Sequence, residues 1–418
     1  MTGTQMKNLA ARLFPICRSI TGEGVRETLH ILQEFADLTI HAVSSGTPVF
    51  DWSVPLEWNV SEAWIADTRG ERVIDFATNN LHLLQYSQSF DGVLKRSELE
   101  LYLHSLPDQP KLVPYKTSYY RETWGFCLSE EQKSSLLDEE YVVHIATTLQ
   151  LGVLNYGEFL IPGKVAEEVL ISTHICHPSL ANDNLSGIVV ALNAVRYFTE
   201  NPGYYSLRLV LVPGTIGAIT WLATNITKLD LIRHGLVITG LGAGDRFHYK
   251  RSELESNLVD RIAEMTLREN DEPFTILPFS PYGYDERQYN SPGIRLPVGC
   301  LMRTPHGTYP EYHTSADNLD FLNVDALEKS SDLLIQIIRN LSANRVYRNT
   351  LPFCEPHLGR RGLYSSDPEE NLAFLWVLNQ SDGSNSLLDI ATRSRMTFSR
   401  IAASAARLFE AGLLEIIG

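Results

Sequence analysis

Residues 169–198 read VLISTHICHPSLANDNLSGIVVALNAVRYF, and this stretch decides the fold class. Its first residues are apolar enough for a buried strand, and the run that begins at Ser186 has the composition of a helix. His174 and His177 follow the strand, and Asp183 lies in the polar loop before the helix. In open α/β sheets, ligands gather at the carboxyl ends of the strands. Imidazole nitrogens and a carboxylate oxygen are typical zinc ligands, so the stretch predicts a metal site.

A further metal ligand is expected from a distant part of the chain. The segment EYHTSADN at residues 311–318 supplies His313, and His306 in the preceding PHGT is the weaker alternative. Asp317 follows His313 by four residues, so it either orients the ring of His313 or caps the next helix. We predict His313 as the metal ligand from this region.

The composition is that of a globular protein of 418 residues, with 44% hydrophobic and 20% charged residues. The formal net charge of -15 argues against a general nucleic-acid binder, whose surface would be basic. No apolar run approaches the roughly 18 residues of a membrane span. The N-terminus lacks the pattern of a signal peptide, and the five scattered cysteines form neither a disulfide framework nor a Cys-x-x-Cys motif. We therefore expect a cytoplasmic protein that does not bind a membrane, and the acidic charge disfavours nucleic acid as a partner.

The alternation of strands and helices after residue 141 predicts a mostly parallel central sheet flanked by helices on both faces. This α/β domain is expected to be discontinuous, with residues 1–41 and 107–350. Short β-rich segments, punctuated by Pro and Gly, predict a small inserted β-containing domain at residues 42–106. A Pro- and Gly-rich linker then separates a third domain at residues 357–418.

The third domain contains amphipathic helices at residues 370–380, 386–392 and 397–412, in the outline of a winged helix. Such a unit commonly reads the major groove of DNA with its last helix. Here the last helix offers Arg400 and Arg407, which is sparse for the phosphate contacts that DNA binding needs. We therefore predict a packing or dimerisation module, and a homo-oligomer formed through it.

Residues 115–126 contain many aromatic side chains, among them Tyr119, Tyr120 and Trp124. Aromatic residues at this density either pack as a seam between domains or form one wall of a substrate pocket. Both interpretations stay open, and the second assigns these three residues to substrate binding.

The motif around Asp183 resembles the metal-bridging motif of the co-catalytic zinc aminopeptidases of the aminopeptidase Y and leucyl aminopeptidase type. YHTSAD at residues 312–317 is similar to their last histidine motif, and STHIC at residues 172–176 is similar to their first. Over essentially its full length, the chain also resembles a bacterial family of aminopeptidase-like proteins. That family has an inserted domain of unknown function and a winged-helix tail, and it often occurs with polysaccharide-biosynthesis genes. The block THxCHPSxANDNxSG and the segment DERQY at residues 285–289 carry this likeness.

The resemblance implies a zinc-aminopeptidase-like α/β fold with Asp183 and His313 as metal ligands. His174 matches the spacing of the first ligand motif, while His177 is nearer to Asp183 in the sequence. Either imidazole could supply the remaining nitrogen ligand, so both histidines stay candidates.

The chain departs from the zinc aminopeptidases at four positions. Those enzymes have Asp where this chain has Cys176, two Glu residues where it has Gly214 and Thr215, and a last Asp ligand where it has Thr239. The resemblance therefore implies that the second metal site is lost and that one zinc ion remains. Gly214 stands where the general base is expected, and loss of a general base typically costs on the order of 10²–10⁴-fold in rate.

The cluster at residues 284–287 offers substitutes for the missing base. Asp285 and Glu286 are the candidate catalytic carboxylates, or else they form a solvated charge cluster with Arg287. In substrate recognition, an acidic group could hold a free amino group and Arg287 could hold a carboxylate. Tyr312, beside the predicted ligand histidine, completes the candidate substrate-binding residues.

We therefore expect a single-zinc aminopeptidase-like hydrolase that cleaves a peptide or aminoacyl amide bond of a small substrate, with a link to polysaccharide biosynthesis through its family. The alternative is a metal-binding protein without turnover that serves in ligand binding or assembly, and Gly214 favours it. A DNA-binding regulator is a third interpretation, which the acidic charge and the sparse basic helix disfavour.

Overall fold

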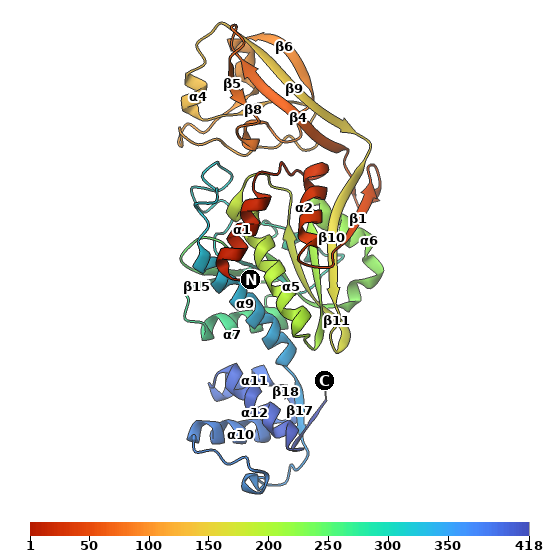
Figure 1. Ribbon diagram of the computed structural model, residues 1–418. Coiled ribbons are helices and arrows are strands. Elements are labelled where there is room, and N and C mark those ends of the chain that lie inside the picture. The colour runs from red at the N-terminus through yellow and green to blue at the C-terminus, as the bar shows by residue number, and fades with distance from the viewer. Residues whose placement is uncertain (418) are drawn as a thin grey trace.

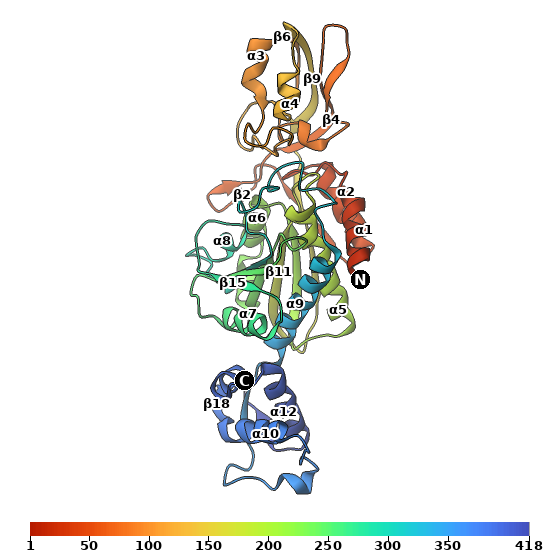
Figure 2. The ribbon, with the colours of Figure 1, turned by 90° about the vertical axis from the view of Figure 1, so that its left-hand side faces the viewer.

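The computed structural model describes residues 1–417 as three parts stacked along one long axis (Figures 1 and 2). A small β domain lies at one end, an α/β domain lies in the middle, and a helical domain lies at the other end. No helix among these residues combines the length and the apolar composition that crossing a bilayer requires.

The middle domain is built on an eight-stranded mixed sheet. In spatial order its strands are β1 (Thr39–Ser44), β10 (Val153–Ile161), β12 (Tyr205–Val212), β11 (Val165–His174), β13 (Ile232–Ile238), β16 (Val298–Met302), β14 (Phe247–Lys250) and β15 (Phe274–Leu277). The four central strands, from β12 to β16, are parallel, whereas β10 and β14 run antiparallel to their central neighbours. The predicted α/β class, with a mostly parallel centre, is confirmed.

Helices cover both faces of this sheet. One face packs against α1 (Gly3–Leu13), α2 (Glu23–Gln33), α5 (Gly187–Glu200), α7 (Leu258–Glu269) and α9 (Val324–Ala343), and the other packs against α6 (Ile216–Thr224) and α8 (Glu286–Tyr289). In β11, Val169 and Ile171 belong to the first core and Leu170 to the second, so the continuous apolar run is explained by burial on both faces.

The small domain has a four-stranded antiparallel sheet in the order β5 (Arg72–Asp75), β4 (Glu57–Ala66), β9 (Glu140–Gln150) and β6 (Phe90–Lys95). Its short elements are α3 (Arg96–Leu99), β7 (Leu103–His104), β8 (Phe126–Cys127) and α4 (Glu130–Ser134). The hairpin of β2 (Pro48–Val49) and β3 (Trp52–Ser53) lies at the junction with the middle domain.

The boundaries predicted for the small domain differ from the structure at both ends. β1 includes residues 42–44 but pairs with β10 of the main sheet, and β9 lies beyond residue 106 but pairs with β4 and β6 of the small sheet. Apolar alternation identifies a strand without telling which sheet it joins, because pairing partners are distant in sequence.

The C-terminal domain combines a three-stranded sheet with three helices. The sheet order is β18 (Asp382–Ser386), β17 (Val346–Asn349) and β19 (Leu414–Ile416), and the helices are α10 (Pro368–Gln380), α11 (Leu387–Ser394) and α12 (Phe398–Glu410). The winged-helix prediction is confirmed, but its sheet begins at β17 rather than after residue 357. Only Asn344 and Arg345 separate β17 from α9, so no linker in the sequence marks this strand as part of the C-terminal domain.

Candidate metal centre

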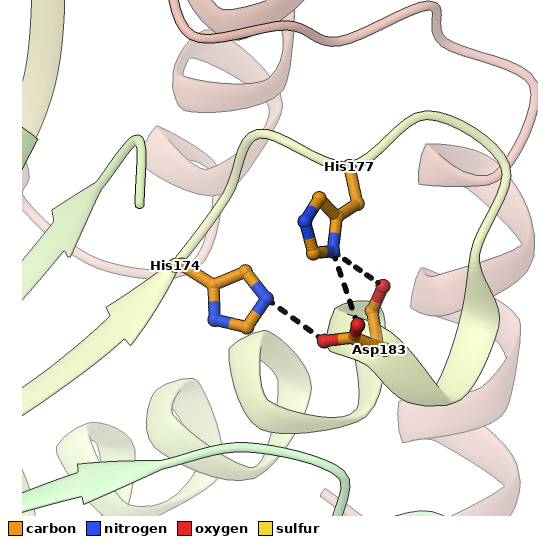
Figure 3. Close-up of side chains that lie close together, drawn as sticks. All are labelled: His174, His177 and Asp183. Atoms are coloured by element: carbon orange, nitrogen blue, oxygen red, sulfur yellow. Dashed lines mark hydrogen bonds and ion pairs between the residues drawn. The ribbon is translucent and has the colours of Figure 1, made fainter. Parts of the chain in front are cut away.

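Strand β11 ends at His174, and the loop that follows it turns back over the carboxyl end of the sheet (Figure 3). Nε2 of His174 lies 2.9 Å from Oδ1 of Asp183, and Nδ1 of His177 lies 3.3 Å from Oδ2 of the same carboxylate. The two histidines flagged as alternatives in the sequence therefore both face Asp183, and neither replaces the other.

His313 joins this group from a segment 130 residues away along the chain. Its Nε2 lies 3.1 Å from Oδ2 of Asp183, so three imidazoles surround one carboxylate. The backbone of His313 has φ +55°, a left-handed conformation that non-glycine residues rarely adopt and that is common at functional sites. The alternative candidate, His306, packs instead against the rings of Tyr282 and Tyr284.

Asp317 holds the loop that carries Asp183. Its Oδ1 accepts the backbone N–H of Asn182 at 2.6 Å, and its Oδ2 accepts the backbone N–H of Asp183 at 2.9 Å. The sequence had suggested that Asp317 orients His313 or caps a helix. It instead ties the first ligand segment to the last one through two backbone hydrogen bonds.

The two asparagines beside Asp183 fasten the loop to the end of β11 and to the segment that follows β13. Nδ2 of Asn184 donates to the carbonyl of His174 at 3.1 Å, and its Oδ1 accepts from the backbone of Gly240 at 3.3 Å. Oδ1 of Asn182 accepts from the backbone of Gly242 at 2.9 Å. The polar NDN motif is therefore explained by buried cross-links that fix the carboxylate in place.

Charge in the group is concentrated on the Asp183 carboxylate, which is fully buried. Burial alone would raise its pKa, but attraction to His177 and hydrogen bonds from the imidazoles hold that pKa well below its usual range. Burial lowers the pKa of His174 and His313, which favours their neutral, ligating form. The pKa of His177 is raised, because the nearby Asp183 outweighs the effect of its burial.

These residues fit a zinc ion by the chemistry of their donor atoms. One ligand atom from each of His174, His177 and Asp183 lies within 4.8 Å of the others, and His313 adds a third imidazole. A buried carboxylate held by imidazoles that have few other partners is the pattern expected of a metal-binding group. The side chain of His313 is 33% exposed, which makes its side of the centre the open one.

Aromatic rings enclose the histidines. Tyr312 stacks on His313 with ring centroids 3.9 Å apart, and Tyr284 stacks on His174 at 5.4 Å. The ring of Tyr115 meets both His177 and His313 edge-on, at 5.0 and 5.1 Å. Tyr115 was not among the predicted site residues, although it begins the aromatic run that drew attention to that segment.

The predicted aromatic wall is only partly at the centre. The hydroxyl of Tyr119 lies 3.2 Å from that of Tyr115, so Tyr119 reaches the centre through a neighbour. Tyr120 lies on the surface against Trp52 at 5.4 Å. The assignment of Trp124 to the substrate pocket is wrong, because its ring stacks between Phe90 and Tyr102 in the core of the small domain.

Asp285 occupies the space beside Gly214. A Cβ atom added to Gly214 would lie 3.5 Å from Oδ1 of Asp285 and 3.1 Å from Cβ of His174. Asp285 is buried, and neither of its carboxylate oxygens has a hydrogen-bond partner among the described residues. Burial, reinforced by the nearby Glu286, raises the pKa of Asp285 to about 7. Asp285 is therefore buried, and it is not part of a solvated charge cluster, which was the alternative interpretation of this segment.

The neighbours of Asp285 have different surroundings. Oε1 of Glu286 lies 2.7 Å from Nζ of Lys250 in a buried ion pair. The half-buried Arg287 places its guanidinium 5.9 Å from the ring of Tyr282. Sγ of Cys176 lies 3.7 Å from the carbonyl oxygen of Gly214, and burial raises the pKa of this thiol to about 12. Asp285 is thus the carboxylate left free to act near the histidines.

Comparison with known protein families divides the chain in two. The model of the family described as a domain of unknown function, DUF4910, matches residues 7–344, and a winged helix-turn-helix model matches residues 345–416. A protein of Clostridium acetobutylicum, named for polysaccharide biosynthesis and for an aminopeptidase-like domain, is 45% identical over 422 residues, which cover 100% of this chain and 97% of that protein.

Several solved structures are also similar to this chain. A crystal structure from Clostridium acetobutylicum, named as that of a peptidase, matches with a TM-score of 0.95 and 45% identity, and the match covers 99% of this chain and 96% of that one. A zinc aminopeptidase from Bacillus subtilis matches with a TM-score of 0.58 and 11% identity, covering 81% of this chain and 95% of that one. An aminopeptidase from Aneurinibacillus sp. strain AM-1 matches with a TM-score of 0.53 and 12% identity, and the match covers 80% of this chain and 93% of that one.

At such low identity, the likeness to the two aminopeptidases shows a shared fold. The family match covers most of the chain, and the relative at 45% identity spans all of it. The chain therefore belongs to the DUF4910 family, whose aminopeptidase-like fold is followed here by a winged helix.

Proposed function

We propose that the chain is a hydrolase with a single zinc ion that cleaves a peptide or aminoacyl amide bond. The observation that carries the proposal is the convergence of three imidazoles on the buried Asp183, with the unpartnered carboxylate of Asp285 beside Gly214. His174, His177, Asp183 and His313 would hold the ion. When bound, zinc supplies a Lewis acid for the substrate carbonyl and the attacking water.

Asp285 takes the role of the base that Gly214 cannot supply. It accepts a proton from the attacking water as the oxygen bonds to the carbonyl carbon. It returns that proton to the nitrogen as the carbon–nitrogen bond breaks, so the amine leaves neutral. A pKa raised to about 7 by burial suits a group that takes up and releases a proton near neutral pH.

The rings of Tyr312 and Tyr284 flank the histidines and limit the shape of the substrate. His313 is the most exposed of the four ligands, so the substrate approaches from its side. The name of the Clostridium relative supports a substrate connected with polysaccharide synthesis, such as an aminoacylated sugar.

The test is release of the amine from a panel of L-aminoacyl p-nitroanilides and aminoacylated amino sugars by the zinc-loaded protein. We expect turnover by the wild type and its loss in Asp285→Asn at unchanged zinc content. A wild type that binds zinc but hydrolyses none of the panel would contradict the proposed activity. It would favour the second candidate, a metal-dependent binding protein, which the absent side chain at Gly214 supports.

A further inference from the structure

The segment between β17 and α10 leaves a large apolar side chain almost wholly in water. Phe353 is 94% exposed, the highest value among the large hydrophobic residues of the described chain. The next residue, Cys354, has φ +64°, a left-handed backbone that residues other than glycine rarely adopt. Such strain persists where the surrounding structure enforces it, so the segment next to Phe353 is held in one conformation.

An apolar groove adjoins Phe353 on the same domain. The groove encloses about 690 Å³ and is lined by Pro352 and Cys354, on either side of Phe353, and by apolar side chains of α10 that include Leu372 and Trp376. Phe353 itself does not line it. A projecting aromatic ring and a hollow therefore lie side by side, and apolar surface of this kind on a folded domain marks an interaction site.

Three arginines of the domain form ion pairs within it. Arg400 on α12 lies 3.0 Å from Asp367, Arg407 forms an ion pair with Glu370, and Arg348 lies 3.5 Å from Glu415. Arginines neutralised in this way release few counterions from a phosphate backbone. The groove itself is lined by apolar residues together with the acidic Glu355 and Asp382, a lining that favours a protein surface over a nucleic acid as its partner.

We propose that the groove receives Phe353 of a second copy of this chain. In the resulting twofold-symmetric dimer, each copy inserts its Phe353 into the groove of the other. A ring and a hollow that adjoin one another on one surface are self-complementary, because a twofold axis between them places each ring in the other copy's hollow. Acidic residues, Glu355 and Asp382, line the groove, and the segment that carries Phe353 also carries the exposed Arg360 and Arg361. A basic segment of one copy is complementary in charge to the acidic groove of the other, which favours pairing of two copies.

The position of the domain agrees with this arrangement. The winged helix forms one end of the elongated molecule, and the connecting segment lies at its outer tip in both views (Figures 1 and 2). A dimer formed there leaves the metal centre open in both copies. The proposal is thus independent of the hydrolase activity and stands or fails separately from it.

Sedimentation equilibrium of the full-length chain tests the contact. We expect a dimer for the wild type at about 100 μM chain, and at least a ~100-fold weaker dimer for Phe353→Ala and for Leu372→Arg, because buried aromatic anchors dominate such interfaces. Leu137→Ala is the matched control, since Leu137 is 86% exposed on the small domain, and it should dimerise like the wild type. Far-ultraviolet circular dichroism establishes that each variant is folded.

Mixing the two interface variants distinguishes a dimer in which Phe353 of one copy enters the groove of the other from any other kind of dimer. Phe353→Ala lacks the ring but keeps the hollow, and Leu372→Arg keeps the ring but lacks the hollow. Each homodimer therefore has no intact contact, whereas the heterodimer has one. We expect a heterodimer in the mixture of two monomeric variants. A monomeric wild type, a Phe353→Ala variant that dimerises normally, or a mixture that stays monomeric would overturn the proposal.

Discussion

The carboxylate of Asp285 lies beside the α-carbon of Gly214, at 3.5 Å from where a Cβ atom of residue 214 would stand. Gly214 lies on the loop after β12, and it offers no side chain of its own to the centre. Here the loop before α8 presents a carboxylate next to the same place. The missing side chain at Gly214 therefore leaves room beside His174 for the buried carboxylate of Asp285.

The first prediction concerns proton transfer by Asp285. Asp285→Asn should lower kcat by about 10²–10⁴-fold, because a positioned general base contributes about that much. The zinc content should stay at the wild-type value, since Asp285 makes no hydrogen bond to the predicted ligands. Steady-state kinetics and metal analysis on the same preparation measure both quantities. Unchanged kcat in an active wild-type background would remove Asp285 from the mechanism.

The second prediction concerns the space at residue 214. In Gly214→Ala the new methyl group would lie 3.1 Å from Cβ of His174, closer than ordinary contact, and should displace that ligand. Disturbing the support of a metal ligand typically weakens binding by about 10–100-fold, so the zinc dissociation constant should rise by that factor. Gly293→Ala is the matched control, because a Cβ atom there would meet nothing within 4 Å. Equal zinc affinity in the two variants would show that His174 tolerates the methyl group.

The third prediction assigns a structural role to Glu286 through its ion pair with Lys250. The two side chains are 1% and 5% exposed, so removing one charge leaves the other buried and uncompensated. Glu286→Gln should lower the free energy of unfolding by about 3–5 kcal/mol. The double variant Glu286→Gln/Lys250→Met should recover most of that loss, as measured by urea denaturation. If the single and double variants were equally destabilised, the ion pair would not be the cause.

The fourth prediction concerns acid stability and the link between α2 and β4. The hydrogen bond from Arg26 to Glu57, 2.7 Å long, outweighs partial burial and lowers the pKa of Glu57 to about 2. A carboxyl whose pKa is lower in the folded chain stabilises the fold at pH values above its unfolded pKa, and this contribution is lost as the pH falls through the folded value. Glu57→Gln should therefore destabilise the protein by about 1–3 kcal/mol at pH 7, and the difference should vanish toward pH 2.

Glu23→Gln is the control for that comparison. Glu23 also pairs with Arg26, but its side chain is 69% exposed, whereas that of Glu57 is 12% exposed. Exposed ion pairs contribute little, so the control should change stability by less than about 1 kcal/mol at pH 7. A pH-independent effect of Glu57→Gln would show that lost packing, rather than charge, causes the destabilisation.

The sequence singled out the residues that converge on Asp183 but not the way in which they are arranged. His174, His177, Asp183 and His313 were identifiable because each lies in a polar segment next to a buried strand or in a recognisable motif. The sequence could not show that both His174 and His177 face Asp183, because that depends on how the loop after β11 folds back. The two backbone hydrogen bonds of Asp317 were also hidden, since their acceptor and donors lie more than 130 residues apart.

The aromatic run shows the same limit. Tyr115 and Trp124 have similar sequence surroundings, yet Tyr115 lies against two histidines and Trp124 lies between two rings of the small domain. Side-chain type indicates that a ring will be buried but not what it will be buried against. The sequence also did not show that β1 joins the main sheet and that β9 joins the small sheet. Strand pairing depends on partners that are distant in sequence.

Zinc binding by the four ligands is the central claim, and one measurement tests it most directly. Zinc per chain is measured by elemental analysis after dialysis against metal-free buffer, in the wild type, in His313→Ala and in His306→Ala. The account predicts one zinc ion per chain in the wild type and in His306→Ala, and loss of that ion in His313→Ala. A wild type without bound zinc, or a His313→Ala variant that retains it at the wild-type level, would contradict the account.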